Sequence, residues 1–320
     1  MDLTGIYHDS IPAFLAEAAA TPPMQRLRGV GMNCGCEYTS FPLFAHWQPY
    51  SRLDHCLGAA LIVWHFTGDP AQTMAALLHD VATPVFSHVV DFLKGDYLTQ
   101  ESTEDGTEAM ILGSRELLEV CRRYGIDPAA ITDYHRYPIA DNDSPKLSAD
   151  RLEYTLGNIV NFGFGTEETV KTYYDDLVAT DTELVFRTPS LAVAFARHAL
   201  ACGKVYVSDE DRYAMQRLAE LLGQAVASGI LQEQDFHKTE EVVIQKLLAS
   251  PLCEAWQAFR GLYRLYRAEN EESRKIFAKK RFIDPCVQDG TRASALDTEF
   301  ARSLAAFRAY SFDYWVSAVK

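Results

Sequence analysis

Four dispersed residues in this chain have side chains that could together bind a divalent metal ion. They are His55, the adjacent pair His79 and Asp80, and Asp150. Two imidazoles and two carboxylates make a mixed nitrogen and oxygen shell, which suits several divalent metals and leaves positions for water and substrate. If the four side chains converge in space, they predict hydrolytic chemistry. If they do not, the chain indicates little beyond a soluble helical protein.

The local sequence favours a buried site, although each residue also has a structural interpretation. His79 and Asp80 end an apolar stretch rich in alanine and leucine. A buried His–Asp pair must be ion-paired or metal-bound, because an isolated buried charge is costly. Asp150 begins another predicted helix, where the helix dipole alone favours a carboxylate. The second His–Asp pair, His8 and Asp9, has no apolar helix before it and is not a candidate.

Helical periodicity dominates the chain and predicts an all-α fold with at most short strands. His55 opens one apolar helix, Pro84 is expected to end the helix that carries His79, and Ser148 is a plausible N-cap of the helix that carries Asp150. The predicted helices cover residues 57–66, 73–78, 85–93, 109–124, 148–159, 191–201, 211–227, 239–248 and 253–267. Weak strand signals occur at residues 36–39 and 280–283.

Length and composition disfavour several classes of protein. A chain of 320 residues with 48% hydrophobic residues can bury a large core. The net charge of −14 disfavours nonspecific binding to nucleic acid. No apolar run is long enough for a membrane span, and no signal peptide is visible at the N-terminus. Seven cysteines without framework spacing predict reduced thiols and a cytoplasmic location.

Five segments resemble one known family, the HD-domain phosphohydrolases related to deoxynucleoside triphosphate triphosphohydrolases. The segments are residues 21–28 (TPPMQRLR), 50–58 (YSRLDHCLG), 79–88 (HDVATPVFSH), 148–154 (SADRLEY) and 279–285 (KKRFIDP). They follow one another in the family's order. The resemblance implies an all-α HD fold, with a metal-binding catalytic core at residues 1–165 and a helical part at residues 166–320 packed on it as one continuous domain. It also suggests a homo-oligomer.

The resemblance also implies roles for individual residues. It implies that the metal is bound by His55, His79, Asp80 and Asp150. It implies that Arg52 contacts phosphate, that Arg151 lies near the phosphates, and that Tyr154 lies near the sugar or base. Tyr206 falls in a segment similar to a family helix and could pack on a base. Two simpler interpretations stay open, a surface salt bridge between Arg52 and Asp54 or another acid, and a core position for Tyr206.

The chain departs from the family pattern around this shell. Thr83 stands where the family has the second histidine of its HDxGH motif, Thr103 falls near a further active-site histidine, and Asn158 replaces an aspartate that recognises a sugar hydroxyl. The stretch that would recognise the base reads Met32-Asn33 instead of Gln-Leu. The resemblance therefore predicts the metal shell and the type of reaction more directly than the substrate.

The chemistry expected is hydrolysis of a phosphate ester or anhydride. A divalent ion (iron, manganese, nickel, cobalt, zinc or magnesium) lowers the pKa of a bound water and polarises a phosphoryl oxygen. Asp80 would orient the water, and His88 could give a proton to the leaving oxygen. His135 is an extra candidate, although an exposed loop position is the simpler interpretation.

We therefore expect a metal-dependent phosphohydrolase that acts on a nucleotide or a related small phosphate ester. Two alternatives remain. One is a phosphomonoesterase with a non-nucleotide substrate, and the other is a nucleotide-binding regulatory module without turnover. Neither a membrane nor a nucleic acid is an expected partner.

Overall fold

The computed structural model describes residues 3–94 and 106–319, and these form an all-α protein with two small antiparallel sheets. The helices are α1 (Thr4–Tyr7), α2 (Ala13–Ala19), α3 (Pro22–Arg26), α4 (Arg52–Thr67), α5 (Pro70–Leu78), α6 (Val89–Lys94), α7 (Thr107–Gly113), α8 (Arg115–Tyr124), α9 (Ala149–Asn161), α10 (Glu167–Asp175), α11 (Pro189–Val205), α12 (Asp209–Ala227), α13 (Glu240–Leu248), α14 (Cys253–Arg260), α15 (Ala293–Leu296) and α16 (Thr298–Ala309). The 3₁₀ turns are η1 (Leu27–Gly29), η2 (Cys36–Tyr38), η3 (Pro42–Phe44), η4 (Pro128–Ala130), η5 (Tyr134–Arg136) and η6 (Glu233–His237). The strands are β1 (Leu177–Ala179), β2 (Leu184–Phe186), β3 (Leu265–Tyr266) and β4 (Ser317–Ala318).

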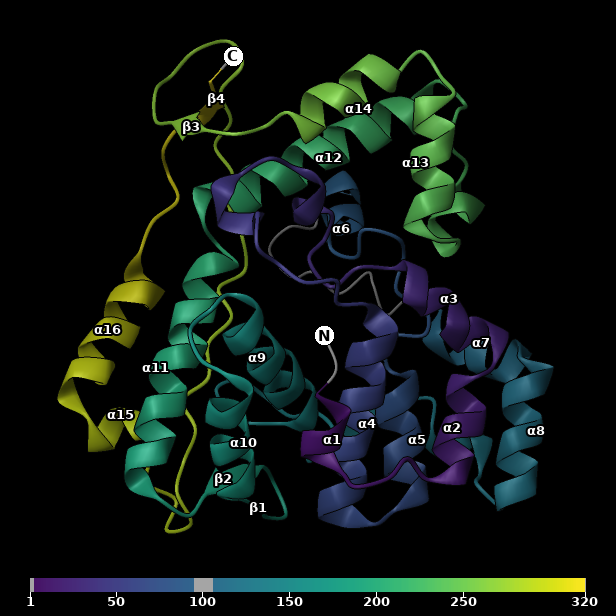
Figure 1. The fold of residues 1–320 in the computed structure, drawn as a ribbon, viewed down its shortest axis with the longest axis vertical. Coiled ribbons are helices and arrows are strands. Elements are labelled where there is room, and N and C mark those ends of the chain that lie inside the picture. Colours follow the sequence, from purple (N-terminus) through teal and green to yellow (C-terminus); the bar gives the residue numbers. More distant parts are fainter. Residues whose placement is uncertain (1–2, 95–105, 320) are drawn as a thin grey trace.

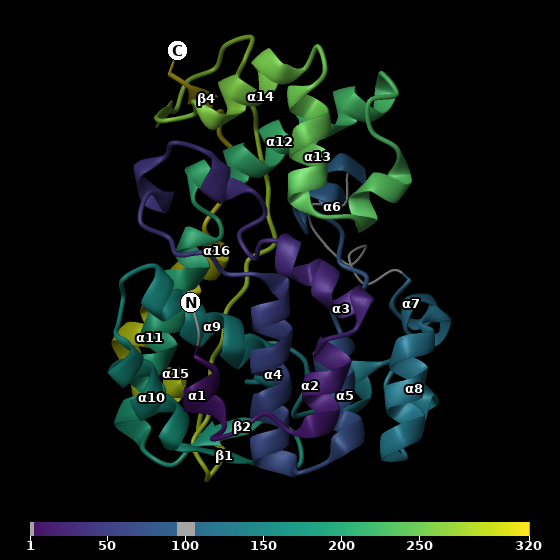
Figure 2. The same ribbon diagram turned by 45° about the vertical axis from the view of Figure 1, so that its right-hand side comes forward.

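The helices lie in two groups, which Figures 1 and 2 show from two directions. In both views α12, α13 and α14 lie at the top with β4 beside them, and α4, α5, α8 and α10 lie towards the bottom. In the lower group α4 packs against both α5 and α9. The upper group is joined to α6 by contacts that α12 makes with this helix. Within the described part of the chain, no helix combines the length and the apolar character that a membrane span needs.

Helix α4 lies in the hydrophobic core and determines how closely its neighbours approach. Residues 59–63 of this helix are almost completely buried. A Cβ atom at Gly58 would lie only 2.6 Å from Oε1 of Glu153 on α9. Because glycine has no side chain, α9 can approach α4 at this point. The close packing brings the N-terminal parts of α4 and α9 together.

The chain between β3 and α15 runs as a long segment with little regular structure. In Figures 1 and 2 it descends from the upper end to α15 near the lower end, and α16 then leads back towards β4. This path passes α11 at Gly203, where a Cβ atom would lie 2.8 Å from the backbone oxygen of Arg281. A second, smaller hydrophobic cluster joins α11 to α15 and α16.

Both predicted strands are wrong. Residues 36–38 form the 3₁₀ turn η2, because Cys34 and Gly35 have positive φ angles of 55° and 77° that reverse the chain. Residues 280–283 form no strand and have no strand partner among the described residues. The strands that do form are too short to leave an alternating pattern in the sequence. β1 and β2 form a hairpin of three residue pairs, and β3 pairs over two residues with β4, which lies far along the chain.

Most predicted helices have shifted ends in the structure, and three of them begin several residues late, are interrupted or end several residues early. The helix expected at residues 85–93 begins only at Val89, because Phe86 and Ser87 adopt left-handed φ angles of 58° and 49°. The helix expected at residues 109–124 is two helices that meet at Ser114, whose side chain caps α8. The helix expected at residues 253–267 ends at Arg260, before Gly261.

Candidate metal centre

The first turn of α4 carries His55. Ser51 and Asp54 form a capping box at this helix start, in which Asp54 accepts hydrogen bonds from the backbone N–H and the hydroxyl of Ser51. This cap satisfies otherwise unpaired N–H groups and so sets where the helix begins. His55 lies four residues after the cap residue Ser51 and is 1% exposed.

His79 and Asp80 stand just beyond the end of α5. The helix ends at Leu78, and His79 occupies the C-cap position, where its Nδ1 lies 2.7 Å from the backbone oxygen of Ala76. The chain then turns through Asp80. Because adjacent residues inside a helix project in different directions, this helix end allows both side chains to reach one place.

Asp150 comes from the first turn of α9. Ser148 caps this helix, as predicted, by accepting a hydrogen bond from the backbone N–H of Arg151. The Oδ1 atom of Asp150 lies 3.0 Å from Nε2 of His55 and 3.7 Å from Nε2 of His79. The helix start therefore directs this carboxylate at the two histidines.

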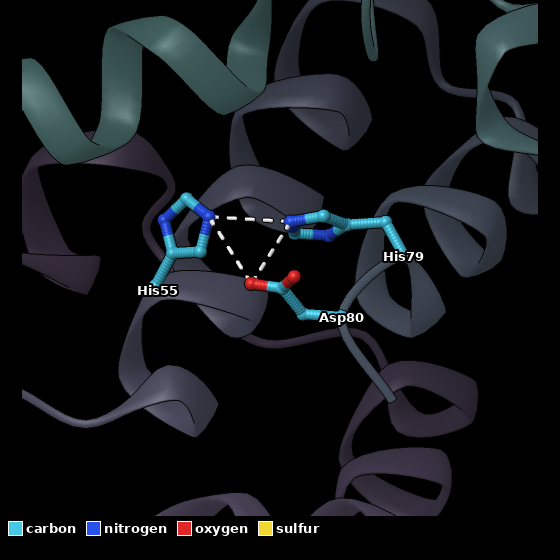
Figure 3. A group of neighbouring side chains, drawn as sticks. All are labelled: His55, His79 and Asp80. Atoms are coloured by element: carbon cyan, nitrogen blue, oxygen red, sulfur yellow. Dashed lines mark hydrogen bonds and ion pairs between the residues drawn. The ribbon is translucent and has the colours of Figure 1, made fainter. Parts of the chain in front are cut away.

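The four predicted ligands converge, and Figure 3 shows three of them. The Nε2 atoms of His55 and His79 lie 3.2 Å apart, and Oδ2 of Asp80 lies 4.0 Å and 3.5 Å from them. Ligand atoms that are each about 2.0–2.2 Å from one ion lie roughly 3 Å from one another. The spacing therefore fits a shared metal ion closely enough for small side-chain shifts to complete the shell.

The hydrogen bonds of the two imidazoles indicate that a cation belongs between them. Nδ1 of His79 faces a backbone oxygen, and Nδ1 of His55 lies 2.6 Å from Oε2 of Glu153. Both Nδ1 atoms therefore act as donors, so each Nε2 presents a lone pair whenever its ring is neutral. Two lone pairs that face each other at 3.2 Å repel unless a proton or a metal ion lies between them.

Glu153 supports the centre from behind, and the sequence reasoning missed it. Its carboxylate is 3% exposed, accepts a short hydrogen bond from the Tyr50 hydroxyl and lies 3.4 Å from the Tyr7 hydroxyl. A carboxylate on the outer nitrogen of a metal-binding histidine orients the ring and raises its basicity. Its spacing of three residues from Asp150, on one side of a helix, was the available signal.

The electrostatics favour a site with ionised carboxylates. Burial would raise the pKa of Asp80, but the Arg52 guanidinium and the two imidazoles hold it well below its usual range. Burial also opposes ionisation of Asp150, yet the hydrogen bond with His55 lowers its pKa to about 2. Burial disfavours the charged form of His55, but Asp150 and Glu153 outweigh it and raise the pKa of His55 to about 10. This histidine thus lies in a strongly negative environment that would attract a cation.

Two further residues hold the Asp80 carboxylate in place. Nη1 of Arg52 donates to Oδ2 at 2.7 Å, and the Thr83 hydroxyl donates to Oδ1 at 2.8 Å. Arg52 is 7% exposed and also donates to the hydroxyl of Ser87. Arg52 thus pairs with the buried Asp80, a proposed metal ligand, and not with Asp54, which forms part of the helix cap.

Arg151 is directed towards the loop before α9. Its guanidinium forms an ion pair with Asp141 at 3.1 Å and donates to the backbone oxygen of Lys146 at 2.9 Å. His135, the extra candidate, is exposed and lies 3.0 Å from Oδ2 of Asp141. Thr103 lies outside the described residues.

His88 lies between an acidic side chain, Asp91, and a basic one, Arg281. Its Nδ1 is 2.9 Å from Oδ2 of Asp91, and its Nε2 is 3.1 Å from Nη2 of Arg281. Burial lowers the pKa of His88, and the charges of Arg281 and Arg52 lower it further against the opposing effect of Asp91. Arg281 was not among the predicted site residues, although it belongs to the segment KKRFIDP that carried part of the resemblance.

Tyr154 and Tyr206 line one side of the centre. The Tyr154 ring lies 6.3 Å from the His55 ring and 6.2 Å from the Tyr206 ring. Nδ2 of Asn158 donates to the Tyr206 hydroxyl at 2.8 Å. Asn158 is 5% exposed, and its buried Oδ1 atom has no hydrogen-bond partner among the described residues. Asp150, Tyr154 and Asn158 are four residues apart along α9 and so share one face of the helix.

Comparisons with known proteins show relatives in sequence and in fold, but no family model matches the chain. An uncharacterized protein of Bacillus subtilis, YdhJ, is 23% identical over 282 residues, which are 87% of this chain and 85% of that protein. A metal-dependent phosphohydrolase of Cordyceps militaris is 25% identical over 228 residues, which are 69% of this chain. The matched region spans 64% of the length of the Cordyceps protein.

Two solved structures share the fold over almost their whole length. A phosphohydrolase from Bacteroides thetaiotaomicron superposes with a TM-score of 0.66 at 14% identity, covering 97% of this chain and 96% of that chain. A hypothetical protein from Aquifex aeolicus superposes with a TM-score of 0.65 at 16% identity, covering 97% and 93%. At this identity the likeness establishes the shared fold.

Proposed function

We propose that this protein is a metal-dependent phosphohydrolase of the HD type, acting on a nucleotide or a related small phosphate ester. The observation that carries the proposal is the pair of Nε2 atoms of His55 and His79, which face each other at 3.2 Å beside the carboxylates of Asp80 and Asp150. The name of the Cordyceps relative, a metal-dependent phosphohydrolase, supports the same reaction class.

The donor set fits a divalent ion. His55, His79, Asp80 and Asp150 would hold it, and mixed nitrogen and oxygen ligands suit iron, manganese, nickel, cobalt or zinc, with magnesium as a further candidate. When bound, such an ion supplies an activated water and a Lewis acid for a phosphoryl oxygen. Glu153 keeps the His55 ring in the tautomer that presents Nε2 to the centre.

Asp80 is the group we propose to orient the attacking water. Because Arg52 keeps its pKa low, the carboxylate stays ionised and can accept a hydrogen bond over the whole neutral range. The Thr83 hydroxyl holds Oδ1, and each carboxylate oxygen has a second lone pair for a further donor. We propose His88 as the proton donor to the leaving group.

The tyrosine side of the centre supports a substrate that carries hydroxyl or amine donors. The buried Oδ1 of Asn158 is an acceptor that a sugar hydroxyl could satisfy, and an unsatisfied buried acceptor costs about 1–3 kcal/mol. Tyr154 and Tyr206 offer ring faces for a base or sugar. These features favour a nucleoside part in the substrate.

A phosphomonoesterase is the second candidate, and the position of Arg151 favours it. A triphosphate chain needs several cations along it, yet Arg151 pairs with Asp141 and Arg52 pairs with Asp80. A single phosphoryl group needs fewer cations around it. The same observation applies to a nucleoside monophosphate and to a non-nucleotide ester.

The test is a product screen with the metal-loaded protein. Deoxynucleoside triphosphates, nucleoside monophosphates and sugar phosphates are incubated separately, and tripolyphosphate and orthophosphate are measured. Tripolyphosphate supports the triphosphohydrolase, and orthophosphate from monophosphates alone supports the monoesterase. Tight nucleotide binding in calorimetry without any product would instead support a regulatory module and contradict the proposed enzyme.

Matched variants link the product to the metal centre. Asp80→Ala and His55→Ala are expected to lose metal and phosphate release while circular dichroism still shows a folded chain. Asp9→Ala changes the other His–Asp pair, which is near the surface, and this variant should retain both the bound metal and phosphate release. Full activity in the first two variants would contradict the proposal. The cytoplasmic location, the homo-oligomer and the boundary at residues 165 and 166 stay predictions.

A further inference from the structure

The segment between β3 and α15 brings a cation from the C-terminal part of the chain to His88. Nη2 of Arg281 lies 3.1 Å from Nε2 of His88, across 193 positions of sequence. The backbone at Arg281 is held against α11, because its carbonyl oxygen occupies the space where a Cβ of Gly203 would be. A glycine in α11 therefore permits the approach that places the guanidinium.

Arg281 also acts on the tyrosine side of the centre. Burial raises the pKa of Tyr154 to about 12, and the charge of Arg281 opposes this rise while that of Asp150 adds to it. Burial likewise raises the pKa of Tyr206, again with Arg281 opposing. Tyr154, whose ring is 6.3 Å from the His55 ring, is thus close to Arg281 and to a proposed metal ligand at the same time.

The hydrogen bond between Arg281 and His88 differs in its acceptor from the ion pairs that Arg52 and Arg151 form. Arg52 donates to the carboxylate of Asp80, and Arg151 pairs with that of Asp141. Arg281 donates to an imidazole nitrogen of His88. A phosphate dianion is a much stronger acceptor for a guanidinium than a neutral ring, because charge-assisted hydrogen bonds are about twice as strong as neutral ones.

The hydrogen bonds of His88 determine where its proton lies. An arginine N–H can only donate, so Nε2 of His88 accepts from Arg281 and carries no proton in this arrangement. The ring proton is on Nδ1, where it is donated to the buried carboxylate of Asp91. While Arg281 stays on Nε2, His88 cannot make a hydrogen bond with a leaving group through that atom.

We propose that Arg281 binds the phosphoryl group of the substrate and that this transfer of its hydrogen bond leaves Nε2 of His88 open to take up a proton from the solvent, while the Nδ1 proton stays donated to Asp91. The imidazolium so formed then gives the Nε2 proton to the leaving oxygen and returns to the neutral ring. The inference rests on the proposed phosphohydrolase function and names the cation that selects a phosphate dianion. Arg281 is thus a binding residue for phosphate and a positioning residue for His88. Both effects come from one side chain, so phosphate binding and the release of His88 are coupled.

Binding of inorganic phosphate to the manganese-loaded protein, measured by calorimetry, tests the proposal without any turnover. Arg281→Ala and Arg281→Gln are expected to weaken phosphate binding about 10- to 100-fold, the usual effect of losing a hydrogen bond to a charged group. Metal content should stay unchanged. Arg281→Lys keeps the charge but not the planar pair of donors, so its phosphate affinity should lie between those of the wild type and Arg281→Gln.

Lys280→Ala is the matched control. It removes the same charge one residue away, where the ammonium donates to the backbone oxygens of Arg308 and Tyr310 instead of to the centre. It should bind phosphate like the wild type. Long-range ¹H–¹⁵N spectra of the histidine rings give a second readout. Phosphate should shift Nε2 of His88 in the wild type and have little effect on it in Arg281→Gln.

The outcomes separate this inference from the proposed function. Phosphate binding that depends on Arg281, without hydrolysis of any ester, would support the inference and contradict the enzyme. Hydrolysis together with unchanged phosphate affinity in Arg281→Gln would contradict the inference and leave the enzyme standing. Absence of phosphate binding to the metal-loaded wild type would also overturn the role of Arg281.

Discussion

Replacement of Glu153 by glutamine tests whether the environment of His55 was built for a metal. The change keeps the shape of the side chain and removes one negative charge. The amide oxygen can still accept from His55 and from the Tyr50 hydroxyl, which share one carboxylate oxygen in the native protein. The amide nitrogen would then face the Tyr7 hydroxyl, 3.4 Å away, which can accept. We therefore expect Glu153→Gln to fold.

The expected effect is on metal affinity. The carboxylate lies 2.6 Å from Nδ1 of His55 and helps to raise the pKa of this histidine to about 10. Its loss makes the imidazole a poorer electron donor to a metal. Replacing an outer partner of a metal-binding histidine typically costs 10- to 100-fold in affinity, or about 1.4–2.8 kcal/mol.

The assay is calorimetric titration of manganese into protein stripped with a chelator. Tyr50→Phe is the control, because it removes one hydrogen bond from Glu153 but keeps the charge. It should change manganese affinity less than about threefold, which is under 1 kcal/mol. If Glu153→Gln binds manganese within twofold of the wild type at equal thermal stability, the reasoning about this carboxylate is refuted.

Three further predictions concern buried groups and close contacts. Burial and the neighbouring Glu240 raise the pKa of Glu37 to about 8, so the folded protein keeps a proton that the unfolded chain releases above its usual pKa near 4.5. Stability should therefore fall as pH rises from 5 to 8, and melting temperatures of Glu37→Gln should fall less. Gly58→Ala places a Cβ 2.6 Å from Glu153 and should cost about 1–3 kcal/mol in urea unfolding; an unchanged midpoint would contradict this packing. Gly203→Ala should displace the Arg281 backbone, so that phosphate affinity falls in calorimetry while metal content is kept.

Local sequence was sufficient for the features that depend on neighbouring residues. Ser148 was predicted to cap the helix of Asp150 and does so. A helix end near Pro84 was also expected, but the structure ends the helix at Leu78, before His79 and Asp80, which the sequence had placed inside it. The all-α class follows from helical periodicity, which each helix carries within its own residues. The errors at residues 36–39 and 85–88 fall where left-handed backbone angles interrupt the chain.

Partners distant in the sequence were beyond such reasoning. Arg52 was expected to meet phosphate or a surface acid, and only the packing of α4 beside the end of α5 reveals Asp80 as its partner. Arg151 points to Asp141 because the loop before α9 folds back on it. A charged side chain has many acceptors of equal merit in a sequence, and geometry alone selects among them.

The sequence by itself determined the types of the four candidate ligands and the helix ends that present them, since caps and helix stops act over a few residues. It could not determine that the Nε2 atoms of His55 and His79 face each other at 3.2 Å, or that Glu153 lies behind one of them. Nor could it bring Arg281 to His88. These contacts depend on helix packing and on a glycine in α11, so only the tertiary structure decided them.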